Sequence, residues 1–138
     1  MKETITMVDM PEPVIRMIKH PDTRKVMATV SPDGEPHMIV CGSLIVTEPD
    51  TIIVGEVFMY RASEYLAKNP NVEFMVWQGR DAYSIKAVAK SRIDTGPIFE
   101  KMSQQLDKMN MTLVAVWVFE AQEVWDESAS KNCGTKVA

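Results

Sequence analysis

The chain has 138 residues, 46% of them hydrophobic and 25% charged, which fits one globular domain with a single core. Its net charge of −4 argues against a nucleic-acid surface, because phosphate backbones are bound by a clustered excess of cations. No apolar run reaches the roughly 20 residues that span a bilayer, and the N-terminus lacks the apolar core of a secretory signal. Two cysteines are too few for a disulfide framework. We therefore expect a cytoplasmic protein without membrane or nucleic-acid partners.

The first half of the chain predicts a short helix and then an antiparallel meander. Pro13 suits the first turn of a helix, and Pro21-Asp22 ends it. Tight-turn signals at 31–34 and 48–50 separate apolar, β-branched runs. These runs predict three strands at 25–30, 36–46 and 51–55. Gly42 lies inside the second run, which indicates a bulge or a close approach to the backbone.

The second half alternates short helices with longer strands. The pattern predicts helices at 62–69 and 98–109 and strands at 72–77, 82–93 and 113–125. Residues 126–138 are polar and predict an arm or a loose tail. We therefore expect a mainly β fold with short helices, built as a small antiparallel barrel. The expected divisions are an N-terminal helical segment at 1–24, a barrel at 25–125 and a C-terminal tail at 126–138.

The segment 55–72 has the features of a monophosphate cradle. A strand ends in a small residue, and a short loop leads to a helix with Arg61 at its start. A helix N-terminus offers free backbone N–H groups, and a guanidinium matches phosphate oxygens. Ser63 adds a hydroxyl in the first turn. From spacing alone, Arg61 as a solvated surface residue and Ser63 as a plain cap remain open.

Four stretches, 25–46, 51–77, 82–102 and 113–125, follow one another in an informative order and spacing. Together they resemble the pyridoxamine 5′-phosphate oxidase-like family of FMN-binding split barrels. The stretch 25–46 resembles the family's opening hairpin, and 51–77 resembles its phosphate-binding strand, loop and helix. The stretch 82–102 resembles a later strand–helix block, and 113–125 the closing strand. The likeness is greatest to the small flavoproteins and flavin reductase-like members. Ala62 and Ala87 depart from the pattern, and Ala62 removes one phosphate donor.

The resemblance implies an antiparallel split β-barrel that forms a homodimer with FMN at the subunit interface. It implies that Arg61 contacts the phosphate, helped by Ser63 and the backbone near Met59 and Tyr60. The ring would lie along Val40, Cys41 and Gly42 and be flanked by Val54, Gly55, Glu56 and Val57. Residues from the partner subunit would complete the site, with Trp77, Gln78, Trp117 and Trp125 as candidates. The strands also carry more apolar surface than one small core can bury, which favours a dimer that covers the excess.

Three functions are compatible with these residues. The first is an FMN-dependent oxidoreductase that passes hydride or electrons from a donor such as NAD(P)H to an acceptor, with no catalytic side chain identified. The second is a non-catalytic FMN carrier for electron transfer. The third keeps the barrel but binds another cofactor, deazaflavin or haem. A true pyridoxamine phosphate oxidase ranks lower, because the chain is short for that enzyme.

Cysteine, glutamate and histidine often have catalytic or metal-binding roles, but their sequence contexts here do not favour such roles. Cys41 is expected to be a small apolar wall, because a reactive thiol needs a lowered pKa and access. Glu56 is expected to face solvent. His20 and His37 follow no metal-ligand spacing, so we predict no metal site.

Overall fold

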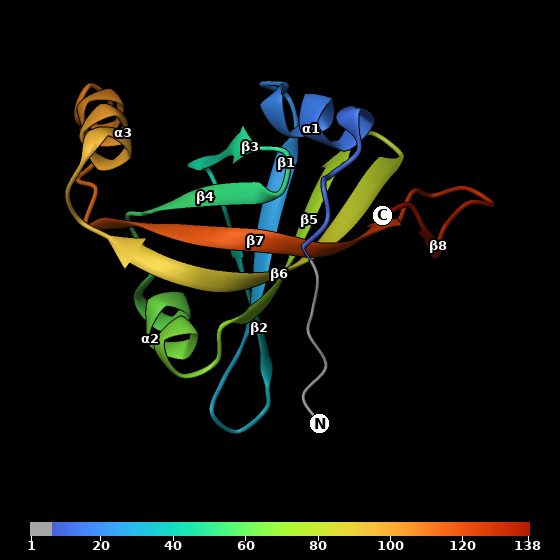
Figure 1. The fold of residues 1–138 in the computed structure, drawn as a ribbon, viewed down its shortest axis with the longest axis horizontal. Helices are drawn as coiled ribbons and strands as arrows, with labels where there is room; N and C mark the ends of the chain where they lie inside the picture. The colour runs from blue at the N-terminus through green and yellow to red at the C-terminus, as the bar shows by residue number, and fades with distance from the viewer. Residues whose placement is uncertain (1–6) are drawn as a thin grey trace.

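We describe the protein from a computed structural model, which describes residues 7–138. Its strands form one antiparallel sheet, and β2, β1 and β5 run across β7, β4 and β6 as in a half-closed barrel (Figure 1). The helices are α1 (Glu12–Lys19), α2 (Tyr60–Lys68) and α3 (Pro97–Asp107). The strands are β1 (Arg24–Val30), β2 (Pro36–Val40), β3 (Leu44–Glu48), β4 (Thr51–Glu56), β5 (Asn71–Gln78), β6 (Asp81–Ile93), β7 (Ala115–Asp126) and β8 (Thr135–Lys136). The expected antiparallel β fold with short helices is confirmed. Within residues 7–138, no helix combines the length and hydropathy that crossing a bilayer requires.

The predicted meander is wrong at its middle strand. The run 36–46 divides into β2 and β3, which lie at opposite ends of the strand order β2-β1-β5-β6-β7-β4-β3. At the bend Cys41–Ser43 the chain leaves its pairing with β1 and begins to pair with β4. The Cys41 N–H donates to the Lys25 carbonyl of β1, whereas the Ser43 carbonyl accepts from the Gly55 N–H of β4. An unbroken apolar run cannot reveal such a change of partner, because the partners lie elsewhere in the chain.

The core consists of two separate apolar clusters that share β4. Ile52 and Val54 point into the main cluster, which α1 covers through Val14 and Ile18. Ile53 points to the other face, into a smaller cluster beneath α3. Residues 52–54 are therefore apolar at every position because both faces of this strand are buried.

The C-terminal segment packs against the end of the sheet. Ser128 is buried, and its hydroxyl accepts the Ala82 N–H at 3.0 Å. Thr135 and Lys136 then return as β8 along the end of β7. Residues of this segment therefore satisfy backbone groups of β6 and β7, and the segment lies along the sheet as an arm.

Gly55 allows α3 to pack closely on β4. A Cβ atom at this position would lie 2.6 Å from Met102 Sδ and 3.1 Å from Leu113 Cδ1. At Gly42, by contrast, a Cβ atom would meet nothing within 4 Å. Of these two glycines, only Gly55 is required by packing, because only there would a side chain clash with its neighbours.

We predict that Gly55→Ala lowers the free energy of unfolding by about 1–3 kcal/mol, because the added methyl displaces Met102. Gly42→Ala is the matched control and should change stability by less than about 0.5 kcal/mol. Urea unfolding of the two variants checks this. Equal effects would contradict the assigned packing role.

Candidate functional site

A hollow of about 330 Å³ lies between β2, β4 and the C-terminal end of α3. We call it the α3 hollow. It brings together seven of the sequence-predicted cofactor residues, namely Val40, Cys41, Gly42, Val54, Gly55, Val57 and Met59. Its remaining walls include Leu106 in the last turn of α3 and Met109 and Met111 just after it, which sequence reasoning missed. The side chains that line it are apolar except that of Ser43, and backbone groups add polar surface, as in many sites that bind small organic molecules.

The Cys41–Ser43 bend forms the floor of the α3 hollow. The space beside Gly42 is open, so a ligand can approach its backbone. The Cys41 side chain is only 4% exposed. Burial raises the pKa of the Cys41 thiol to about 12, and the nearby Lys25 charge opposes this only in part. The thiol is therefore protonated at neutral pH and adds no charge to the lining of the hollow.

Glu56 is the centre of a buried hydrogen-bond network next to this hollow. It is 8% exposed, so the expectation that it faces solvent is wrong. Its carboxylate accepts bonds from Arg92 Nε at 3.0 Å and Nη2 at 2.9 Å. The Trp117 indole N–H and the Ser63 hydroxyl also donate to it, each at 2.8 Å. The network joins β4, β6, β7 and α2.

Strand alternation explains why these side chains meet. Trp117 of β7 lies opposite Val54 of β4 and also opposite Arg92 of β6. Glu56 is two residues beyond Val54, so it projects from the same face toward Trp117. Alternation along the strand places Glu56 on the same buried face as Ile52 and Val54, and this pattern could have indicated that Glu56 is buried. Arg92 was missed because its partners are known only from the strand register.

The hydrogen bonds stabilise the charged form of Glu56. Burial alone would raise the pKa of this carboxyl. The bonds from Arg92, Ser63 and Trp117 outweigh burial, and its pKa lies below the ordinary value of 4.5. Glu56 is therefore an anion at neutral pH, paired with the Arg92 cation at 2.9 Å.

The start of α2 has the character of an anion site. Met59 is its N-cap and makes no side-chain cap hydrogen bond, and the first turn holds no acidic residue. Tyr60 and Arg61 are exposed in this turn. The Arg61 guanidinium donates only to the Tyr65 hydroxyl, at 3.3 Å, among the residues that the structure describes. Ser63 is different, because its hydroxyl is engaged by Glu56.

A second hollow, of about 500 Å³, lies on the other side of the same bend and at the start of β1. We call it the β1 hollow. It shares Val40, Cys41 and Gly42 with the α3 hollow, and Trp77 forms part of its wall. The other seven predicted residues line neither hollow, namely Glu56, Tyr60, Arg61, Ser63, Gln78, Trp117 and Trp125. Trp117 is 7% exposed and turned toward Glu56 inside its own subunit.

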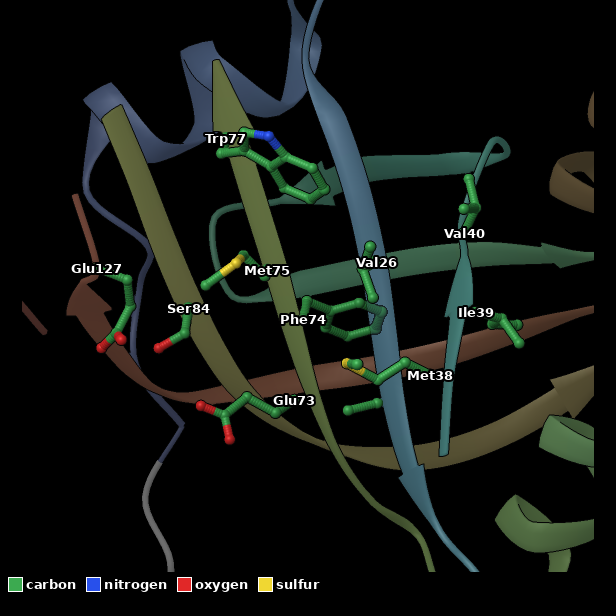
Figure 2. Close-up of a pocket in the computed structure, with 11 residues that line it drawn as sticks. Val26, Met38, Ile39, Val40, Glu73, Phe74, Met75, Trp77, Ser84 and Glu127 are labelled. Carbon is green, nitrogen blue, oxygen red and sulfur yellow. The ribbon is translucent and has the colours of Figure 1, made fainter. Parts of the chain in front are cut away.

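An apolar surface continues from these hollows across the outer side of β2, β1 and β5, which we call the outer sheet face. Met38 is 70% exposed, Val40 82% and Met75 38%. Figure 2 shows Val40 on β2, Val26 on β1, and Met75 and Trp77 on β5. Exposed apolar patches of this kind mark interaction surfaces.

A family model described as pyridoxamine 5′-phosphate oxidase matches residues 13–128. The chain belongs to the pyridoxamine 5′-phosphate oxidase family. The recognised stretches therefore belong to a family domain that covers most of this chain, including both hollows. No functionally curated protein matches the chain in sequence.

Solved structures of this family's fold resemble the chain over most of its length. An FMN-binding protein from Syntrophomonas wolfei subsp. wolfei has a TM-score of 0.73 and 20% identity, covering 85% of this chain and 83% of its own. An F420 reductase has a TM-score of 0.64 and 16% identity, with coverages of 83% and 97%. HutZ, the heme storage protein from Vibrio cholerae, has a TM-score of 0.60 and 18% identity, with coverages of 86% and 96%. Identities this low establish the shared fold.

We predict that Glu56→Gln costs about 1–3 kcal/mol of stability at pH 7, because Arg92 loses a charged partner. A lowered carboxyl pKa stabilises the fold above the ordinary value of 4.5, and this contribution is lost as the pH falls through the lower folded value. The difference between wild type and variant should therefore shrink below about pH 4.5 in urea unfolding.

Glu123→Gln is the control for this prediction. Glu123 pairs with the partly exposed Lys86 and Lys136 at 3.8 and 3.4 Å, so its loss should cost less than about 1 kcal/mol. A Glu56→Gln penalty that stays constant from pH 7 to pH 3 would show that the charge of Glu56 contributes nothing.

Proposed function

We propose that the protein is an FMN-binding oxidoreductase that passes hydride or electrons from a donor such as NAD(P)H to an acceptor. The observation that carries this proposal is the α3 hollow, which gathers seven residues expected from the sequence beside the start of α2. Family membership supports the cofactor class, since one structural neighbour is an FMN-binding protein. The remaining steps concern how this chain's residues would hold the cofactor.

The phosphate would be held at the start of α2. Arg61 has no carboxylate partner among residues 7–138, so its cation is available to an anion. The uncapped first turn adds backbone N–H groups and the positive end of the helix dipole. The Ser63 hydroxyl instead ties this turn to Glu56, which makes Ser63 a positioning residue for the phosphate site.

The flat ring would lie on the Cys41–Ser43 bend. The open space beside Gly42 fits a planar group against the backbone, and the neutral Cys41 thiol adds no charge there. Bound FMN supplies reversible one- and two-electron chemistry. The chain supplies orientation, and Leu106 and Met111 at the α3 end exclude water from the ring. Because Glu56 is neutralised by Arg92, the network places little net charge beside the ring.

We further propose a homodimer formed through the outer sheet face. Met38, Val40 and Met75 leave apolar surface on the monomer that isologous pairing would cover. Val40 lies on this face and also lines both hollows, so the interface would border the cofactor. Trp77 is then placed to complete the partner's site. Sedimentation velocity tests this, and a monomer that carries a full complement of FMN would overturn it.

A second candidate is the same hollow with a different flat cofactor. The F420 reductase and the heme storage protein share the fold, and Ala62 leaves the phosphate site with fewer donors. No histidine lines either hollow within the described chain, which favours a flavin or deazaflavin over haem. Mass spectrometry of the ligand released from native protein separates these alternatives.

We predict that the purified protein binds FMN and is yellow, and that NADH or NADPH bleaches the flavin band under anaerobic conditions. Reduced nicotinamide is a hydride donor, and the site needs no side-chain acid or base for the transfer. Stopped-flow absorbance measures the rate. Protein that binds FMN but is reduced only by another protein would instead be an electron carrier. Protein that takes up no FMN would contradict both the oxidoreductase and the electron-carrier hypotheses.

We predict that Arg61→Ala weakens FMN binding about 10- to 150-fold, which corresponds to losing a charged phosphate contact of about 1.5–3 kcal/mol. Lys68→Ala is the matched control, since Lys68 is an exposed cation in the last turn of the same helix. It should leave the affinity unchanged within about twofold. Fluorescence quenching of FMN measures both, and an Arg61→Ala affinity equal to wild type would place the phosphate elsewhere.

A further inference from the structure

Tyr65 holds one edge of the Arg61 guanidinium. The two residues lie about one helical turn apart on α2, and the Tyr65 hydroxyl accepts hydrogen bonds from Arg61 Nε and Nη2, each at 3.3 Å. The guanidinium carbon lies 5.8 Å from the centre of the Tyr65 ring. A guanidinium has another edge, formed by Nη1 and Nη2, which can make parallel hydrogen bonds to a phosphate. Tyr65 therefore orients the cation without occupying the edge that would bind the anion.

Tyr65 is held in turn by the hairpin of β1 and β2. Its ring meets the His37 imidazole edge to face, with ring centres 5.5 Å apart and ring planes at 89°. His37 Nδ1 lies 3.3 Å from the Thr29 hydroxyl and forms a hydrogen bond with it. Thr29 is only 1% exposed and lies opposite His37 in the register of the two strands. We call Thr29, His37 and Tyr65 the Arg61 support, because they link a buried position of β1 to the cation on α2.

Strand alternation and the helix period explain why these side chains meet. Along β2, His37 is partly buried, whereas Met38 and Val40 are exposed on the outer sheet face. His37 therefore points to the opposite side of the hairpin, where α2 packs against β1 and β2. Tyr65 follows Arg61 by 4 residues, which places both on one face of α2.

The Arg61 support matters because the phosphate site contains few donors. Ala62 contributes none, so within the described first turn of α2 only Arg61 has a positive side chain. Arg61 is exposed, and an exposed arginine that rotates freely loses conformational entropy when it binds an anion. A side chain that Tyr65 already holds loses less entropy, so its contact with a phosphate contributes more to affinity.

We propose that Tyr65 is a positioning residue through which the site selects flavins that carry a terminal phosphate over those that lack one. His37 and Thr29 hold Tyr65, Tyr65 orients Arg61, and Arg61 binds the phosphate. The inference rests on the proposed function, since it concerns the same site at the start of α2. It adds that recognition of the phosphate depends on the hairpin of β1 and β2 as well as on α2.

The test compares FMN with riboflavin, which has the same ring and ribityl chain but no phosphate. Fluorescence quenching on the full-length protein gives both dissociation constants. Tyr65→Phe removes the hydroxyl and keeps the ring that faces His37. We expect this variant to weaken FMN binding about three- to tenfold, because Arg61 loses an ordering hydrogen bond, and to leave riboflavin binding within about twofold. General damage to the site would instead weaken both ligands and overturn the proposal.

Tyr83→Phe is the matched control. Tyr83 is a partly buried tyrosine of β6 that lines neither hollow. Losing the same hydroxyl there should leave the affinities for FMN and riboflavin within about twofold of wild type. A loss of FMN affinity equal to that in Tyr65→Phe would overturn the assignment of Tyr65.

A double-mutant cycle separates positioning from direct contact. If Tyr65 acts through Arg61, adding Tyr65→Phe to Arg61→Ala should change FMN affinity by less than about twofold, because the group that Tyr65 orients is gone. A full Tyr65→Phe effect in the Arg61→Ala background would mean that the hydroxyl contacts the cofactor itself, and the positioning role would be wrong.

The contribution of His37 is tested by removing its ring and then restoring one. His37→Ala should weaken FMN about two- to tenfold and spare riboflavin, because Tyr65 loses its aromatic neighbour. His37→Phe supplies another ring at the same place and should recover FMN affinity to within about twofold of wild type. Equal losses in the two variants would show that ring packing does not hold Tyr65.

Failure of this inference differs from failure of the proposed function. Wild-type FMN affinity in Tyr65→Phe, together with weak binding in Arg61→Ala, would overturn the Arg61 support and leave the phosphate site intact. Wild-type affinity in Arg61→Ala would refute the phosphate site itself, and the Arg61 support with it. Wild-type protein that binds riboflavin as tightly as FMN would also refute both.

Discussion

The buried carboxylate of Glu56 is the interaction on which the site depends. A charge at this depth is tolerated only when its hydrogen bonds are satisfied, and here Arg92, Trp117 and Ser63 supply four of them. Each donor comes from a different element, so the same requirement fixes three elements relative to β4. The first turn of α2 is one of these, which makes the orientation of the proposed phosphate site a consequence of an interior ion pair.

The parts of the fold that could be predicted are those encoded locally. Proline and glycine turns, alternation in 82–93 and the apolar run 52–54 placed most elements near their observed positions. The missed features depend on distant residues. Glu56 resembles an exposed strand end until Arg92 and Trp117, 36 and 61 residues further along, are seen to surround it. The candidate ring residues were predictable as a group only through the family resemblance.

The bend at Cys41–Ser43 shows why a single missed boundary matters. It converts one apparent strand into two edges of the sheet, and both hollows lie against it. Val40, at its start, is 82% exposed and belongs to both hollows and to the outer sheet face. In the proposed assembly, cofactor and partner subunit therefore meet at one strand end, and binding of either would stabilise binding of the other by mass action.

The division of the interior into two clusters has a consequence for how such a protein evolves. The residues beneath α3 form their own small cluster, distinct from the one that holds the barrel together. The end of α3 is also a wall of the α3 hollow. Mutations that reshape this helix would alter the pocket while leaving most of the folding energy intact. Selection is thereby free to diversify chemistry on a conserved scaffold.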